Sequence, residues 1–286
     1  MALKNGVTSL RSLEPRETFH PGIGPMQEAC VLHVEQQRLV ERALAKDEDF
    51  QLWDVGLGAA ANALAAIQAL RRGIPVSHPH KIIIHSFDKS TEPLEFALQN
   101  ATALGYLLGY EDIIRELLTK GSVAIENNIV WKFQYGDFSR DISSGDFSRD
   151  IPNSALPSPD SIFYDPYSPI GNPEMWTLQN FINLRAKISD SRPCLLSNYT
   201  RSTSVRVSLL LAGFYVGIGC LIHEKDETTL ASTHLDAIER PLDRKWLEKR
   251  VRISINAAPL RSVPYSTGPI SNDDFEALLK LPQFSV

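Results

Sequence analysis

The chain has 286 residues, of which 43% are hydrophobic and 22% are charged, and its formal net charge is −5. This length and apolar fraction support a sizeable core and exclude a wholly disordered protein. No apolar run approaches the roughly 18 residues of a transmembrane helix, and the first residues form no apolar signal core. We therefore expect a cytoplasmic protein without a membrane partner. The 3 cysteines are far apart and the 7 histidines show no metal-ligand spacing, so no metal site is expected.

Predicted strands and helices alternate along most of the chain. Residues 1–28 are polar and rich in glycine and proline, so no packed element is expected before about Glu28. Strands are predicted at residues 50–55, 81–87, 129–135, 162–164, 193–199, 214–218 and 228–232. Helices are predicted at residues 34–45, 92–107, 112–118 and 203–212, with one more ending at Gly73 and one starting at Asn172. This alternation indicates an α/β fold with a mostly parallel, seven-stranded sheet, whose last two strands form an antiparallel hairpin.

Two segments fall outside this alternation. Residues 236–286 carry no strong pattern and are expected to form a helical, partly irregular tail. The heptapeptide at residues 136–142, Gly-Asp-Phe-Ser-Arg-Asp-Ile, recurs at residues 145–151. A single duplication of this length is no solenoid, and we interpret it as a tandem insertion that lengthens a loop.

A glycine-containing turn follows the first predicted strand. Gly56 and Gly58 permit a sharp turn and the close approach of a ligand, and their spacing to Ala61 also matches the dinucleotide fingerprint. Asp54 separates two ligands, because an acid here crowds an anionic pyrophosphate but suits the cationic amino group of S-adenosyl-L-methionine. The sequence therefore favours S-adenosyl-L-methionine over a nicotinamide dinucleotide. The alternative is that Asp54 merely caps the turn.

Acidic residues follow the next two predicted strands. Asp88 is suited to accept hydrogen bonds from both ribose hydroxyls of a nucleoside. Asp137 is suited to bind the exocyclic amine of adenine, with Phe138 beside the ring. Asp146 offers the same chemistry from the repeated heptapeptide, but an apolar strand runs directly into Asp137, which we therefore favour. For both residues the alternative is a solvated loop acid.

A further strand delivers Asp165 to the edge where open α/β sheets bind ligands. The following Pro-Tyr-Ser-Pro fixes the backbone and leaves carbonyls without competing donors. A carboxylate and a carbonyl in this arrangement can hold both hydrogens of a primary amine and aim its lone pair at a methyl donor. The Asp-Pro-Tyr sequence is similar to the Asp-Pro-Pro-Tyr motif of enzymes that methylate amino groups in nucleic acids. Because a carboxylate alone keeps an amine protonated, we expect Asp165 to orient the amine rather than to act as a strong base.

Residues 163–177, Phe-Tyr-Asp-Pro-Tyr-Ser-Pro-Ile-Gly-Asn-Pro-Glu-Met-Trp-Thr, resemble the signature of the MnmC-type methyltransferase domain. That domain belongs to tRNA 5-methylaminomethyl-2-thiouridine enzymes. The family's Asp-Gly-Phe-Ala-Pro is here Asp-Pro-Tyr-Ser-Pro. Further similar segments lie at residues 24–29, 54–62, 87–89, 199–206, 213–214 and 224–228, so the resemblance spans Thr18 to Thr233.

The resemblance implies a class I, Rossmann-like methyltransferase fold with S-adenosyl-L-methionine as cofactor. It also implies methylation of the aminomethyl nitrogen on the wobble uridine of tRNA. Asp165 and Tyr167 would be catalytic. The cofactor site would comprise Glu28, Asp54, Gly56, Gly58, Asn62, Asp88, Lys89, Asp137, Phe138 and Asp165. Bifunctional members of the family also carry a flavin oxidase domain, for which we expect this chain to be too short.

We therefore expect an N-terminal segment, residues 1–28, packing near the cofactor site, a methyltransferase domain at 29–235 and a tail at 236–286. The expected partner is tRNA. The alternatives are another amine acceptor (a small molecule, a protein or another nucleic acid) and a non-catalytic module that only binds the cofactor. Six basic residues between 240 and 252 suit phosphate contacts, but the acids Asp243 and Glu248 favour a solvated helix face.

Overall fold

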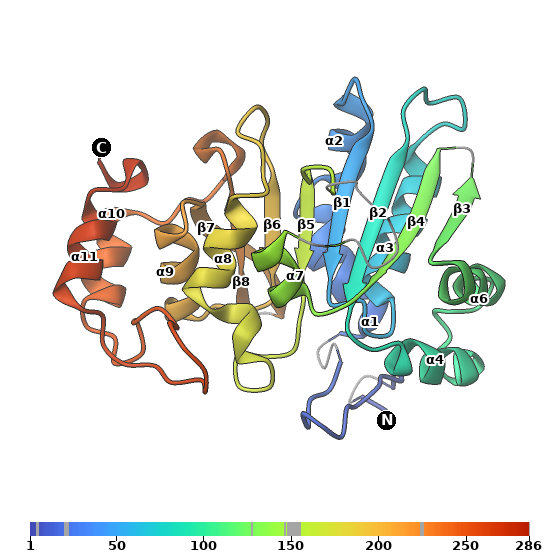
Figure 1. The fold of residues 1–286 in the computed structure, drawn as a ribbon, viewed down its shortest axis with the longest axis horizontal. Coiled ribbons are helices and arrows are strands. Elements are labelled where there is room, and N and C mark those ends of the chain that lie inside the picture. Colours follow the sequence, from blue (N-terminus) through green and yellow to red (C-terminus); the bar gives the residue numbers. More distant parts are fainter. Residues whose placement is uncertain are drawn as a thin grey trace.

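The computed structural model describes residues 1–3, 6–19, 23–126, 128–145, 147, 156–223 and 226–285. Within these residues, one eight-stranded sheet has the order β3-β4-β2-β1-β5-β6-β8-β7 (Figure 1). Neighbours from β4 through β6 pair in parallel, whereas β8 is antiparallel to both β6 and β7. The α/β fold and its closing hairpin are confirmed. The strands are β1 (Phe50–Val55), β2 (Ile82–Asp88), β3 (Ser122–Glu126), β4 (Ile129–Tyr135), β5 (Ser161–Tyr164), β6 (Leu195–Asn198), β7 (Tyr215–His223) and β8 (Asp226–Ser232).

The prediction of seven strands misses β3, which pairs antiparallel with β4 at the edge of the sheet. Gly121, in the left-handed region with φ of 70°, ends the preceding helix and turns the chain into β3. An edge strand needs only one partner and a short apolar face, here buried at Val123. A segment of five residues with this composition carries too weak an alternation to be recognised from sequence.

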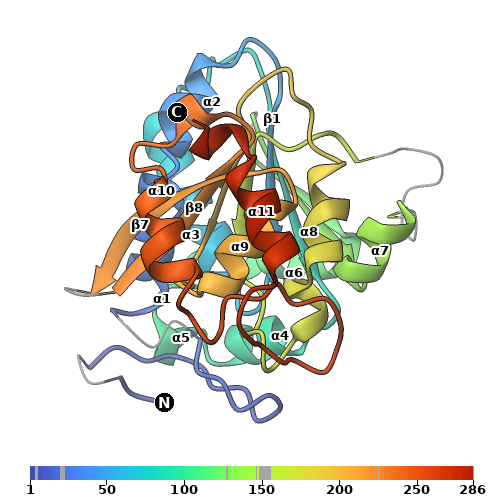
Figure 2. The same cartoon turned by 90° about the vertical axis from the view of Figure 1, so that its left-hand side faces the viewer.

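The two faces of the sheet are covered by helices from different halves of the chain (Figures 1 and 2). Because successive strand residues point to opposite faces, Leu52 packs in one core while Trp53 and Val55 pack in the other. The first core is completed by α1 (Pro25–Ala29), α2 (Leu39–Ala45), α3 (Ala61–Gly73), α4 (Glu92–Gln99), α5 (Ala101–Leu104) and α6 (Glu111–Lys120). The second is completed by α7 (Phe138–Ser144), α8 (Leu178–Arg185), α9 (Thr203–Leu211) and α11 (Asn272–Leu279).

Several predicted helix bounds are wrong. The helix expected at 34–45 is interrupted at Arg38, whose φ of 50° ends a π-helical turn (η1, Cys30–Glu35) before α2 begins. The helix expected at 92–107 stops at Gln99 and resumes as α5. The helix expected to start at Asn172 begins as a 3-10 turn (η2, Pro173–Trp176). Its α-helical part, α8, starts after Thr177, whose hydroxyl accepts a hydrogen bond from the Asn180 amide.

The first copy of the repeated heptapeptide forms a helix rather than an extended loop. Asp137 caps α7 by accepting a hydrogen bond from the Arg140 amide at 3.3 Å. Most of the second copy, including Asp146, lies outside the described residues. Phe147 from that copy packs in the second core, with its ring centroid 5.8 Å from that of Phe87.

The tail is an integral layer of the second core. Its residues Leu247, Val251 and Leu278 are fully buried against α8 and α9. The Leu178 amide at the start of α8 donates to the Leu260 carbonyl at 2.7 Å. The elements of the tail are η3 (Leu235–Ala237), α10 (Arg244–Trp246), a π-helical turn η4 (Leu247–Val251), α11 and η5 (Pro282–Phe284).

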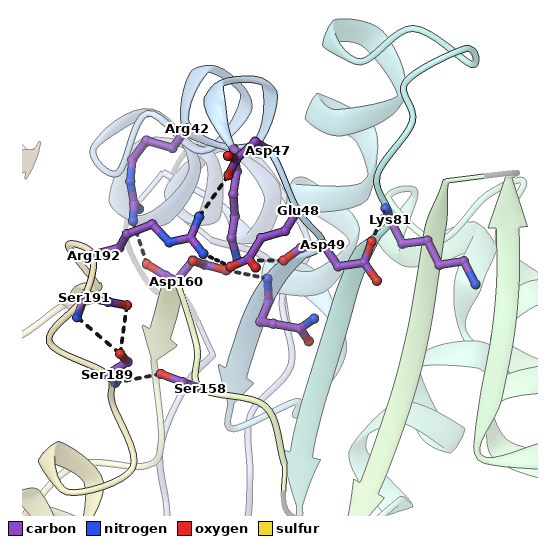
Figure 3. Close-up of polar contacts among 12 residues, drawn as sticks. Arg42, Asp47, Glu48, Asp49, Lys81, Ser158, Asp160, Ser189, Ser191 and Arg192 are labelled. Atoms are coloured by element: carbon purple, nitrogen blue, oxygen red, sulfur yellow. Dashed lines mark hydrogen bonds and ion pairs between the residues drawn. The ribbon is translucent and has the colours of Figure 1, made fainter.

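A network of ion pairs closes the amino edge of the sheet (Figure 3). Asp160, which precedes β5, accepts hydrogen bonds from Lys46 Nζ and from the Gln51 amide, each at 2.7 Å. Arg192 binds both Asp47 and Glu48. These contacts hold the start of β5 beside the start of β1. The opposite, carboxyl edge of the strands is lined by a cavity.

Candidate functional site

A cavity of about 1220 Å³ lies at the carboxyl edge of the parallel strands. This is where open α/β sheets bind ligands. Residues that follow β1, β2, β4, β5 and β6 line it, together with the N-terminal segment. The cavity brings together all but one of the residues that the sequence assigns to the site: Glu28, Gly56, Gly58, Asn62, Asp88, Lys89, Asp137, Phe138, Asp165 and Tyr167.

The turn after β1 is built from glycine because neighbouring chain segments lie against it. Gly56 has φ of +97°, and a Cβ atom there would lie 2.6 Å from the backbone oxygen of Asp165. A Cβ atom at Gly58 would lie 2.8 Å from the ring of Phe19. The turn therefore sits directly between the end of β5 and the N-terminal segment, where a side chain would displace one or the other.

Asp88 is held at the end of β2 by two backbone amides. Gly58 N donates to its Oδ2 at 2.9 Å, and Ser90 N donates to its Oδ1 at 3.1 Å. Burial raises the pKa of this carboxyl group despite those bonds. A carboxylate has about four acceptor positions, so Asp88 keeps capacity for a hydroxyl-bearing ligand. The neighbouring Lys89 is exposed, and its Nζ lies 3.8 Å from Glu174 Oε1.

Asp165 and Asn62 form the central polar contact of the cavity. Asn62 Nδ2 donates to Asp165 Oδ2 at 2.8 Å, joining the start of α3 to the end of β5. Burial raises the pKa of Asp165 to about 7, and the Asn62 hydrogen bond opposes that rise. Asn62 is 3% exposed, and its Oδ1 has no hydrogen-bond partner among the residues that the structure describes. A buried acceptor of this kind beside a cavity suits a ligand that donates a hydrogen bond.

Asp54 is the predicted residue that does not line the cavity. Its side chain is fully buried in β1, where Oδ2 accepts a hydrogen bond from Ser86 Oγ at 2.6 Å. Ser86 Oγ in turn accepts from the indole nitrogen of Trp131 at 2.9 Å. The direct contact with a ligand amino group that the sequence suggests therefore stays a prediction, because the Asp54 side chain does not line the cavity in this structure. Residue 54 lies inside β1, one position before Val55, which is the residue of that strand that lines the cavity.

The electrostatics of Asp54 nevertheless couple it to the cavity. Burial raises its pKa to about 7, the Ser86 hydrogen bond lowers it, and the charges of Asp165 and Asp88 raise it further. Three carboxyl groups thus share a poorly solvated region, and each is biased toward its neutral form. A cationic ligand in the cavity would restore the ionised forms, which matches the positive charge of S-adenosyl-L-methionine.

Asp137 and Phe138 lie at the far side of the cavity, after β4. Besides lining the cavity, the Asp137 carboxylate caps α7. Phe138 is buried, with its ring centroid 5.0 Å from that of Phe87 in an edge-to-face arrangement. Its ring therefore forms part of an apolar wall on that side.

The N-terminal segment supplies cavity residues that sequence reasoning missed. The carboxylate of Glu17 accepts hydrogen bonds from the Ser168 amide at 2.9 Å and from its hydroxyl at 2.5 Å. The ring of Phe19 meets Tyr167 edge-to-face, with centroids 5.7 Å apart. Residues 17 and 168 are 151 positions apart in sequence, and no local motif announces their contact.

The residues that the structure describes contain no group of three or more His, Cys, Asp or Glu side chains arranged to hold a metal ion. None of their helices is both long and apolar enough to cross a bilayer.

The chain is similar to known methyltransferases. Residues 109–234 match the model of a family described as S-adenosyl-L-methionine-dependent methyltransferase. The tRNA 5-methylaminomethyl-2-thiouridine biosynthesis bifunctional protein MnmC of Vibrio campbellii is 26% identical over 214 residues. That alignment covers 69% of this chain but only 30% of the Vibrio protein.

A solved structure extends the similarity. The crystal structure of MNMC2 from Aquifex aeolicus is 25% identical and aligns with a TM-score of 0.68. The match covers 98% of this chain and 83% of that one. It therefore includes the tail, which the sequence resemblance did not reach.

Proposed function

Because the chain is an S-adenosyl-L-methionine-dependent methyltransferase similar to the methyltransferase domain of MnmC, we propose that it methylates a primary amine. We propose further that this amine is the aminomethyl group of wobble 5-aminomethyl-2-thiouridine in tRNA. The observation that carries the proposal is the position of Asp165, which lies in the cavity at the end of β5, in contact with Asn62. The name of the Vibrio relative supports the choice of acceptor.

The cavity residues are suited to hold the cofactor. In the proposal, Asp88 accepts hydrogen bonds from the ribose hydroxyls, Asp137 accepts one from the adenine amine, and Gly56 and Gly58 let the backbone approach closely. The unpartnered Asn62 Oδ1 supplies a further acceptor. When bound, S-adenosyl-L-methionine supplies an electrophilic methyl group to the acceptor nitrogen.

Asp165 then acts on the acceptor amine. Its carboxylate accepts a hydrogen bond from the amine, and Asn62 fixes the carboxylate from the other side. Burial raises the pKa of Asp165 to about 7 in the empty cavity, and the positive charge of the cofactor would lower it, so that the ionised carboxylate orients the amine. Most of the rate enhancement comes from holding the nitrogen in line for attack. Tyr167, next to Pro166, helps enclose that position by packing its ring against Phe19.

The test combines binding and turnover in two variants. Asp165→Asn is expected to keep the Kd for S-adenosyl-L-methionine within about threefold and to lower kcat by about 100-fold or more. Asp88→Ala is expected to weaken cofactor binding, because it removes the proposed partner of the ribose. Calorimetry measures binding, and transfer of labelled methyl groups to tRNA bearing 5-aminomethyl-2-thiouridine measures turnover. Asp112→Asn, at an exposed position on α6, is the matched control.

Each part of the proposal has its own contrary result. Turnover that survives in Asp165→Asn contradicts the role of the carboxylate. Methylation of small amines but not of tRNA contradicts the proposed acceptor and leaves amine methylation intact. Cofactor binding without transfer to any amine identifies a non-catalytic module.

A further inference from the structure

A second hollow, of about 930 Å³, adjoins the methyl-transfer cavity. The two share Arg201 and Glu227 in their linings, so they adjoin at the carboxyl edge of the sheet. The hollow lies between the start of α9 and the tail, and we call it the tail groove. Figure 1 places the connection between α10 and α11 at the same lower edge of the molecule as the N-terminal segment.

The charge of the tail groove is positive. Among its described lining residues are Arg201, Arg206 and Arg250, against the carboxylate of Glu227. Arg206 is 3% exposed and is neutralised locally, since its Nη1 lies 2.9 Å from Glu227 Oε1. Its other nitrogens donate to the Thr229 hydroxyl and the Thr228 carbonyl, each at 2.9 Å. The pair therefore forms a rigid floor, and Arg201 and Arg250 bring two further guanidinium groups to the lining.

Those arginines come from separate elements and converge. Burial lowers the pKa of Arg206, the Glu227 pair raises it, and the nearby charges of Arg250 and Arg201 lower it again. Guanidinium groups gathered in one place favour the binding of an anion beside them. In the preceding element, α10, Arg244 instead pairs with Glu248 at 3.3 Å and does not line the groove.

The remaining lining is aromatic and apolar. Trp246 and Tyr265 contribute half-buried rings, and Leu221, Ile253 and Ile255 are 52%, 74% and 76% exposed. Aromatic rings beside arginines are typical of surfaces that bind single-stranded nucleic acid. There the cations follow phosphates and the rings stack on unpaired bases.

We propose that the tail groove binds the single-stranded RNA that flanks the nucleotide being methylated. In this arrangement Arg201 and Arg250 contact its phosphates, and Trp246 and Tyr265 stack against its bases. This inference rests on the proposed function, because it takes the acceptor to be a nucleotide in an RNA loop. Because the groove and the cavity adjoin at Arg201 and Glu227, one strand can extend from one into the other. The basic segment at residues 240–252 thus contains residues of two kinds. Arg244 is paired with Glu248 at the surface, whereas Arg250 lines the groove.

The experiment measures RNA binding without cofactor, so that it does not depend on catalysis. The probe is a synthetic anticodon stem-loop RNA, titrated by fluorescence anisotropy at several salt concentrations. Arg250→Glu is expected to raise its Kd by about tenfold and to reduce the slope of log Kd against log salt by about 0.7 or more. Tyr265→Ala is expected to raise the Kd by about fivefold or more through lost stacking. Arg244→Glu is the matched control and is expected to change both quantities little.

A second measurement separates the groove from the methyl-transfer site. With tRNA as acceptor, Arg250→Glu is expected to raise KM and leave kcat near the wild-type value. With the free 5-aminomethyl-2-thiouridine nucleoside, which has no flanking phosphates, kcat/KM is expected not to change. A change with the nucleoside equal to that with tRNA overturns the groove proposal, because it shows damage to the catalytic cavity.

The contrary outcomes are distinguishable. If wild-type enzyme methylates tRNA and Arg250→Glu behaves like Arg244→Glu, the groove proposal is wrong and the proposed function stands. If tRNA is not methylated, the proposed function fails, and the binding titration alone decides the groove. Weak RNA binding by the wild type, with no difference between the two charge reversals, overturns the groove proposal in that case.

Discussion

Three carboxyl groups at the ends of neighbouring strands, Asp54, Asp88 and Asp165, lie where burial favours their neutral form. Each has a compensating hydrogen bond, from Ser86, from backbone amides and from Asn62 respectively. Keeping three such groups together lowers the stability of the fold, and in the proposed function it favours the binding of a cation. In the proposed function Asp54 acts without touching the ligand, because a cation bound in the cavity would favour its ionised form.

The raised pKa of Asp54 predicts how the stability of the protein changes with pH. Its pKa is raised from 3.8 to about 7, so the native state holds a proton that the unfolded state has already released. The stability contributed by this protonated group is complete below pH 3.8 and is lost as the pH rises through about 7. Asp54→Asn removes that loss. We expect the variant to gain stability relative to wild type between pH 5 and pH 8, by up to a few kcal/mol, since one pKa unit corresponds to about 1.4 kcal/mol.

Urea unfolding at pH 5, 6, 7 and 8, about one unit apart, measures this difference for wild type and variant. Asp112→Asn, almost fully exposed on α6, is expected to show a constant offset from wild type. A pH-independent difference for Asp54→Asn would show that the native carboxyl group is already ionised near pH 5.

Among the secondary-structure elements, the two edges of the sheet differ. The amino edge holds a network of ion pairs, and the carboxyl edge holds the cavity. Asp160 and Lys46 at the amino edge have side chains only 11% and 9% exposed. Their contacts set the start of β5 beside β1, and hence the height at which Asp165 leaves β5 at the other end. The pairs of Arg192 with Asp47 and Glu48 lie farther out, at the surface.

We therefore expect the buried and the exposed part of this network to contribute differently to the free energy of unfolding. Asp160→Ala removes two charge-assisted hydrogen bonds, one to Lys46 and one to the Gln51 amide, and should lower the free energy of unfolding by about 2–3 kcal/mol. Asp47→Ala, whose side chain is 95% exposed, should cost about 0.5 kcal/mol or less. Denaturant unfolding of both variants at neutral pH provides the comparison. Equal losses would mean that burial does not govern this network.

The elements that sequence predicts well are those whose signal is local. The apolar strands before Gly56, Asp88 and Asp165 end in residues of distinct chemistry, and parallel packing necessarily brings their carboxyl ends together. The start of α8 was misplaced because Asn172-Pro173 carries a cap signal, yet the Thr177 hydroxyl makes the hydrogen bond. Contacts such as that of Glu17 with Ser168 depend on the tertiary fold alone and leave no trace in either segment.

At the scale of the whole molecule, the tail joins the core instead of following it. Residues 236–286 lack the periodicity that identifies a packed helix, because their buried positions are spread over short turns. Leu247 and Val251 come from a π-helical turn, and Leu278 comes from a helix of 8 residues. Each is fully buried in the same hydrophobic core as residues of α8 and α9, which come much earlier in the chain. The position of the tail groove follows from this packing, since the tail forms one of its walls.

If the tail and the sheet form one cooperative unit, damage to the tail should destabilise both together. Leu278→Ala opens a cavity at a site with no exposure and should cost about 2–5 kcal/mol. Leu108→Ala, at a position 53% exposed, should change stability by about 0.5 kcal/mol or less. Far-ultraviolet circular dichroism follows the whole fold, while tryptophan fluorescence senses Trp246 in the tail together with Trp53, Trp131 and Trp176 outside it. We expect both signals to shift to the same lower urea midpoint in Leu278→Ala. The contrary outcome is an early fluorescence transition in this variant with the dichroism midpoint unchanged. It would show that the tail unfolds from an intact methyltransferase core. The packing of the tail would then stabilise the groove without stabilising the sheet.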